Sequence, residues 1–103
     1  MPRELPSIAI GSRRVAEDVP PFILAEIGLN HGGSLDRALA LVDAAARAGA
    51  HGIKVQTVVA KDLVSQGSPA PAHVGAVSMV EFFARFEFDE KAYKAIFDKA
   101  RGL

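Results

Sequence analysis

The sequence predicts an α/β fold with a parallel sheet, and three observations within residues 22–57 support this prediction. The run FILAEIG at 22–28 is apolar except for one acid, as in a strand buried on both faces. Apolar residues then recur at helical spacing over 35–46, and a second strand-like run, HGIKVQT, occupies 51–57. Strands separated by an amphipathic helix are typical of a parallel sheet covered by helices.

The helix between these strands has clear start and stop signals. Ser34 is a suitable N-cap, and Asp36 lies in the first turn, where the helix dipole favours a carboxylate. Gly49 stands where a left-handed residue commonly ends a helix. The turn LNHGG at 29–33 lacks the lysine of a P-loop and the spacing of a dinucleotide fingerprint, so its glycines are expected to serve turn geometry.

Polar side chains of the two strands are expected to meet at one site. Alternation puts Glu26 on one face of the first strand, and Lys54 and Gln56 on one face of the second. Because the Ile and Val residues between them should face the covering helix, the three polar side chains should point away, towards a barrel axis or a crevice. They also lie in the C-terminal halves of their strands, where parallel α/β folds place active sites.

The remaining chain divides into three segments. Residues 7–16 read as a β-hairpin, with a Gly-Ser turn between alternating residues. Residues 58–76 break the pattern, and a long loop after a strand's C-terminal end is where such folds build binding surface. Residues 77–102 are expected to form helices.

Two helices are expected in that last segment. Ser78 caps the first, which runs to about Phe86, and Val77 and Phe82 flank its start as a hydrophobic staple. Asp89 caps the second. Its buried stripe is expected to comprise, at helical spacing, Tyr93, Ile96, Phe97 and Ala100.

Composition argues against several classes of protein. Twelve basic and twelve acidic residues balance, without a basic run, which argues against nucleic acid or an anionic membrane as a partner. The absence of cysteine excludes disulfides and thiolate zinc sites, and a cytoplasmic location is expected. No apolar run approaches the ~18 residues of a membrane-spanning helix.

Two motifs resemble the sialic-acid synthase family. Residues 21–33, PFILAEIGLNHGG, resemble its opening motif, and residues 48–57, AGAHGIKVQT, resemble its second-strand motif. The run AKDLV at 60–64 also fits, and the resemblance covers nearly the whole chain. The chain departs from residues frequent in the family (Asn or Phe) at three positions, Gly32, Val55 and Val58.

The resemblance implies a (β/α)8 TIM barrel of the N-acetylneuraminate synthase type. Such an enzyme condenses phosphoenolpyruvate with an N-acetylated hexosamine, such as N-acetylmannosamine, to a nine-carbon 2-keto acid. It also implies a divalent metal (Mn or Mg) that acts as a Lewis acid, with ligands outside this chain, and a homodimer of the full-length protein. The relatives include enzymes for legionaminate, pseudaminate and spore-coat polysaccharide.

The chain, residues 1–103, is expected to be the N-terminal part of that barrel: the hairpin and the first two βα units. A barrel needs eight strands and about 250 residues, so the isolated fragment is expected to be inactive.

The resemblance assigns roles residue by residue. Glu26 matches the family's catalytic glutamate, and Lys54 matches the lysine that holds anionic phosphoenolpyruvate. Gln56, Asn30 and His31 are candidate substrate-binding residues, the last two on the loop before a helix N-terminus. The competing structural roles are a Glu26–Lys54 ion pair, a barrel-lining hydrogen bond for the amide, and loop ordering for the other two.

Two other functions stay open at this point. The chain could belong to another phosphate-handling barrel that shares only the βαβ unit. It could also be a non-catalytic anion-binding or remnant module of a truncated barrel. Further strand–helix units with two metal-spaced histidines after Leu103 would favour the synthase, whereas a stop there would favour the module.

Overall fold

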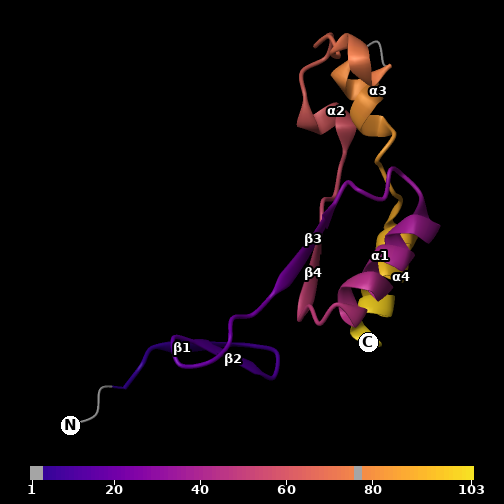
Figure 1. Ribbon diagram of the computed structural model, residues 1–103. Helices are drawn as coiled ribbons and strands as arrows, with labels where there is room; N and C mark the ends of the chain where they lie inside the picture. The colour runs from indigo at the N-terminus through magenta and orange to yellow at the C-terminus, as the bar shows by residue number, and fades with distance from the viewer. Residues whose placement is uncertain (1–3, 76–77) are drawn as a thin grey trace.

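The computed structural model describes residues 4–75 and 78–103 of a chain that extends over 63 × 29 × 24 Å. Its elements in chain order are β1 (Ser7–Ile10), β2 (Arg13–Ala16), β3 (Leu24–Gly28), α1 (Leu35–Arg47), β4 (Gly52–Val55), α2 (Ala60–Leu63), the 3₁₀ turn η1 (Ala72–Val74), α3 (Met79–Ala84) and α4 (Glu90–Arg101). Figure 1 shows β3 and β4 side by side, with α1 and α4 together on one side of them. The hairpin lies beyond one end of these strands, and α2 and α3 lie beyond the other.

The β1–β2 hairpin falls within the range where the sequence predicts one. Its strands pair antiparallel from Ser7 opposite Ala16 to Ile10 opposite Arg13, and Gly11 has a φ of 60° in the turn. The hairpin lies near the amino ends of β3 and β4 (Figure 1), as a separate two-stranded sheet. Its Ile8 side chain is 64% exposed, so this end of the chain leaves apolar surface uncovered.

The predicted parallel sheet is confirmed, because β3 and β4 pair parallel with Glu26 directly opposite Lys54. Both strands are shorter than expected: 22–28 begins at Leu24, and 51–57 is reduced to Gly52–Val55. At the carboxyl ends, a register shift between Glu26 and Gly28 interrupts the pairing. At the amino ends, the cause lies at Ile23. Its carbonyl accepts from both His51 N (2.8 Å) and Gly52 N (3.2 Å), and its N–H donates to the His51 ring Nδ1 at 2.8 Å. A side chain thus takes the place of a ladder partner.

The core lies between this sheet and the helices α1 and α4. Ile27, Ala38, Val42 and Ile96 are its buried members, and half-buried Ile53 and Val55 pack against them. The helix predicted to begin at Ser34 is confirmed, since the Ser34 hydroxyl accepts from Arg37 N at 3.2 Å. Gly49 ends it with a φ of 91°, in the left-handed region that glycine tolerates.

The C-terminal helices follow the prediction with two corrections. Asp89 caps α4 through Ala92 N at 2.8 Å, whereas α3 ends at Ala84 and not near Phe86, because tighter i→i−3 turns follow it. Phe97, expected in the buried stripe of α4, is 44% exposed. It adjoins Ile96, which occupies the centre of the face packed on the core, so Phe97 is turned to the edge. The predicted staple residue Val77 lies outside the described residues.

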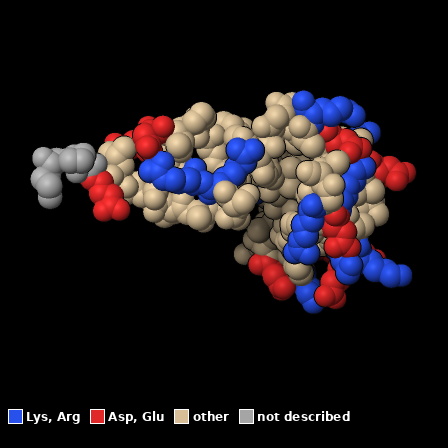
Figure 2. Space-filling view, turned by 90° about the horizontal axis from the view of Figure 1, so that it is seen from below, with Lys and Arg blue, Asp and Glu red and all other residues tan. Residues whose placement is uncertain are grey.

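Charges of both signs are interspersed on the surface. In Figure 2, Lys, Arg, Asp and Glu side chains intermingle over the thicker end of the molecule, and a row of basic side chains crosses the elongated end near the N-terminus. No large single-sign area covers this face. Among the described residues, no helix has the length and apolar character that a membrane span requires.

Candidate functional site

Glu26 and Lys54 form an ion pair on the sheet face that α1 does not cover. Their Oε2 and Nζ atoms are 3.0 Å apart, and the two side chains are 53% and 63% exposed. Ile27, Ile53 and Val55 face the core instead, so the predicted juxtaposition of the carboxylate and the ammonium is present. An ion pair as exposed as this one adds little to stability, so stability alone does not account for it.

Gln56 joins this pair across Gly28. A register shift between Glu26 and Gly28 interrupts the ladder, and Gly28 has a φ of 55°. A Cβ at Gly28 would lie 3.1 Å from both Gln56 Oε1 and Glu26 Oε1. The two oxygens therefore flank a position with no side chain, at the carboxyl ends of both strands. A ligand group that donates hydrogen bonds could meet two acceptors there, with the Lys54 ammonium close by.

Asn30 orders the turn after β3. Its side-chain Nδ2 and its backbone N–H both donate to the Ile27 carbonyl, at 2.8 and 3.0 Å. The residue is exposed on the loop between β3 and α1, beyond the same strand ends as the ion pair. Its predicted role in substrate binding stays a prediction, while the loop-ordering contact is present.

His31 is completely buried, with none of its surface exposed. Its Nδ1 accepts from Gly33 N at 2.9 Å, and its ring lies 4.4 Å from the Phe88 ring, centre to centre. In the neutral imidazole the proton therefore sits on Nε2, which has no hydrogen-bond partner among the described residues. In this conformation His31 fixes the loop from inside and does not line an open surface.

Burial lowers the pKa of His31 below the ordinary value of 6.5, because desolvation disfavours the charged ring. Near pH 6.5 the His31 ring is therefore protonated in the unfolded chain but stays neutral in the folded chain. The free energy of unfolding should fall as the pH drops below that value. The slope of this contribution approaches about 1.4 kcal/mol per pH unit. Urea denaturation of the purified protein at pH 7.5 and 5.5 measures it.

The matched control for this pH effect is His31→Asn, whose Oδ1 can accept from Gly33 N but does not titrate. All other titrating groups are shared by the two proteins, so the difference between their pH profiles isolates His31. Identical profiles would show that the ring takes up its proton equally well in the folded chain.

Three hydrogen bonds that the sequence did not predict hold the backbone after β4. The Tyr93 hydroxyl donates to the Gln56 carbonyl at 3.2 Å and accepts from Val58 N at 3.3 Å. The Glu87 carboxylate accepts from Ala60 N at 2.5 Å. The partners lie 27 to 37 residues apart in the chain, so no local sequence pattern predicts these hydrogen bonds. The sequence predicted only that the Tyr93 ring is buried.

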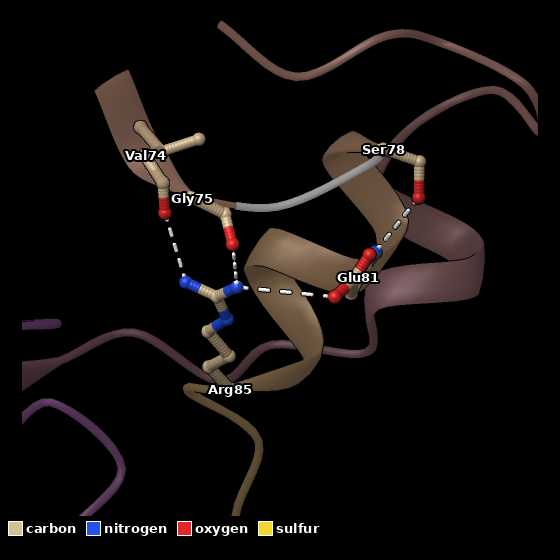
Figure 3. A network of polar contacts seen from close by, with 5 residues as sticks. All are labelled: Val74, Gly75, Ser78, Glu81 and Arg85. Atoms are coloured by element: carbon tan, nitrogen blue, oxygen red, sulfur yellow. Dashed lines mark hydrogen bonds and ion pairs between the residues drawn. The ribbon is translucent and has the colours of Figure 1, made fainter. Parts of the chain in front are cut away.

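Arg85 ties the end of the long loop to α3, as Figure 3 shows. Its guanidinium donates to the carbonyls of Val74 (2.9 Å) and Gly75 (2.6 Å), and it lies 3.9 Å from the Glu81 carboxylate. The Ser78 hydroxyl caps α3 by accepting from Glu81 N at 3.1 Å. The segment predicted as a loop at 58–76 is therefore not wholly irregular, since it contains α2 and η1, and the Arg85 guanidinium holds it near its far end.

The described residues do not form a metal site. Within 4–75 and 78–103, no three His, Cys, Asp or Glu side chains come together in a way that could hold an ion. The Nδ1 atoms of His31 and His51 are each occupied by a backbone N–H.

Comparison with known proteins confirms the resemblance found in the sequence. Residues 41–103 match the NeuB family. The chain is 44% identical over 75 residues to the spore coat polysaccharide biosynthesis protein SpsE of Bacillus subtilis, covering 73% of this chain and 20% of that protein. It is 34% identical over 80 residues to the N,N'-diacetyllegionaminic acid synthase of Campylobacter jejuni, covering 73% of this chain and 24% of that one.

Solved structures show the same α/β fold. The N-acetylneuraminic acid (sialic acid) synthetase of Leptospira borgpetersenii, in complex with citrate, superposes with a TM-score of 0.77 at 28% identity. That match covers 95% of this chain and 31% of the other. The B. subtilis SpsE structure gives a TM-score of 0.66 at 33% identity, over 94% of this chain and 25% of the other. The chain therefore spans between a fifth and a third of the length of these relatives.

Proposed function

The chain belongs to the NeuB family, and on this premise we propose that it supplies the first strand–helix units of a barrel enzyme that makes a nine-carbon 2-keto sugar acid. In the proposed reaction, the methylene carbon of phosphoenolpyruvate bonds to the aldehyde carbon of an N-acetylated hexosamine of the N-acetylmannosamine type. The aldehyde oxygen takes up a proton, water is consumed, and inorganic phosphate leaves. The observation that supports this most directly is the Glu26–Lys54 pair beside Gln56 at the strands' carboxyl ends.

Lys54 is proposed to bind phosphoenolpyruvate, whose carboxylate and phosphate are both anionic. Its ammonium is a compact cation with three donors, suited to such groups. The side chain is 63% exposed, and within the described residues Glu26 is its one ion-pair partner. An incoming anion can therefore reach Nζ without displacing any packed core residue.

Glu26 is proposed to handle the proton at the reacting centre. A carboxylate within hydrogen-bond reach of a reacting hydroxyl or water contributes typically about 10²- to 10⁴-fold to a rate. Gln56, with its Oε1 next to Gly28, is proposed to orient the sugar through hydrogen bonds, since an amide both donates and accepts. Asn30 and His31 are proposed to support the substrate indirectly, by fixing the loop that borders it.

Apolar surface left open in the chain supports its place within a larger barrel. Ile23 and Leu24, at the start of β3, are 47% and 57% exposed, and Ile8 and Ile10 of the hairpin are 64% and 45% exposed. Further strands and helices would cover these side chains. The divalent metal and the homodimer belong to the same proposal; the metal would polarise the sugar aldehyde, and no ligand role is assigned to the described residues.

The test is a condensation assay on the full-length protein that contains this chain. Phosphoenolpyruvate, Mn²⁺ and either N-acetylmannosamine or a diacetamido hexose are supplied, and phosphate release and product mass are measured. We expect phosphate release that depends on the sugar, with one phosphate per 2-keto acid formed. Binding of phosphoenolpyruvate without turnover on any sugar would instead favour the non-catalytic anion-binding module.

A further inference from the structure

The Tyr93 hydroxyl closes the backbone turn that carries Gln56. It donates to the Gln56 carbonyl at 3.2 Å and accepts from Val58 N at 3.3 Å, so one oxygen satisfies a backbone acceptor and a backbone donor two residues apart. Val58 is buried, with 4% of its surface exposed. A donor buried there has little access to water, so loss of the hydroxyl would leave it unsatisfied.

The Gln56 side chain starts from this tethered backbone and reaches the site. Its Oε1 lies beside Gly28, as Glu26 Oε1 does, and Glu26 Oε2 pairs with Lys54. Gln56 lies one residue beyond β4, which ends at Val55, and its backbone is held on two sides. Its N–H donates a long hydrogen bond of 3.5 Å to the Gly28 carbonyl, and its own carbonyl accepts from Tyr93. The direction of the amide therefore depends in part on the contacts that follow the strand.

The Tyr93 ring also connects this turn to the other loop at the site. Its centre lies 5.6 Å from that of Phe88 in an edge-to-face contact, and Phe88 lies 4.4 Å from His31. His31 in turn accepts from Gly33 N in the loop after β3. The three rings of His31, Phe88 and Tyr93 thus form one row of contacts. This row connects the loop after β3 with the turn after β4.

We propose that Tyr93 is a positioning residue for the condensation, acting through Gln56. This inference rests on the proposed function. The hydroxyl holds the turn after β4, and the turn aims the Gln56 amide at the substrate beside Glu26. Small displacements of a catalytic or orienting group are costly, since a shift of about 1 Å can slow a reaction by about 10²-fold. Tyr93 itself does not touch the substrate.

The test variant is Tyr93→Phe in the full-length enzyme, which removes the hydroxyl and keeps the ring. We expect kcat to fall by about 10-fold, while KM for phosphoenolpyruvate changes by less than about twofold, because Lys54 and its surroundings are unaltered. If Tyr93 acts through Gln56, the double variant with Gln56→Ala should be no slower than Gln56→Ala alone. If the fold-reductions in kcat of the two single variants multiply in the double variant, the inference is wrong.

A matched control separates positioning from loosened packing of α4. Lys99, on the same helix, forms a 2.8 Å ion pair with Asp43 of α1, with side chains 33% and 37% exposed. Lys99→Met should lower the melting temperature without lowering kcat. If Lys99→Met slows turnover as much as Tyr93→Phe at equal loss of melting temperature, helix docking explains both, and the inference is wrong.

Amide hydrogen exchange tests the tether without any substrate. In Tyr93→Phe, the Val58 amide should exchange at least about 10-fold faster than in the wild type, while the Ile53 amide within β4 keeps its rate. An unchanged Val58 rate would overturn the tether whether or not the enzyme turns over. A wild-type protein with no condensation activity would overturn the proposed function and the catalytic role of Tyr93, and the exchange result would still decide the contact.

Discussion

Replacing Glu26 by glutamine is expected to lower kcat of the full-length enzyme by about 10²- to 10⁴-fold, the range typical of a lost proton-transfer group. The amide keeps the shape and can still accept a hydrogen bond, but it cannot take up and return a proton. Stability should hardly change, because the side chain is 53% exposed and its ion pair with Lys54 is solvated. We expect the melting temperature to stay within about 2 °C.

Asp18→Asn is the matched control for Glu26→Gln. Asp18 pairs with Arg14 at 2.8 Å, with side chains 48% and 46% exposed, so it too loses one partner of an open ion pair. It follows β2 in the chain by two residues, and the hairpin lies near the opposite ends of β3 and β4 (Figure 1). The kcat of the Asp18→Asn variant should stay within about twofold of the wild-type value. Glu26→Gln activity within tenfold of wild type would refute the assigned role.

The sheet and the ion pair were predictable because they follow from local rules. Period-two alternation decides which side chains share a strand face, and a βαβ unit brings its two strands together in parallel. Glu26 and Lys54 occupy paired positions on such strands. Their contact could therefore be predicted without knowledge of long-range packing. The same holds for Ser34 and Asp89, whose capping contacts span only three residues.

The surroundings of the site depend on contacts that no local pattern contains. The burial of His31 results from its packing on Phe88, 57 positions later, and the Gln56 turn depends on Tyr93, 37 positions later. The apolar stripe of the helix predicted that the Tyr93 ring packs on the core. It did not predict which backbone groups the hydroxyl contacts. Phe97 was assigned to the same stripe because apolar character alone does not distinguish the centre of a helix face from its edge.

Replacing Gly33 by alanine is expected to destabilise the full-length protein by about 3 kcal/mol or more, through backbone strain and a steric clash together. Gly33 has a φ of 84°, a conformation that side chains disfavour. A Cβ there would lie 2.1 Å from the carbonyl oxygen of Arg85, which is backbone and cannot swing aside. The loop after β3 and the end of α3 would have to separate.

Gly67→Ala isolates the clash, because Gly67 has a similar φ of 79° and nothing within 4 Å of its added Cβ. It should cost only the left-handed conformation, about 1 kcal/mol. Urea denaturation followed by circular dichroism compares the two variants. The separation in Gly33→Ala should also disturb His31, whose Nδ1 accepts from Gly33 N, and so lower turnover of the molecules that still fold. Equal losses of stability in both variants would mean that the chain relieves the clash between Gly33 and the Arg85 carbonyl at no cost, and would contradict this prediction.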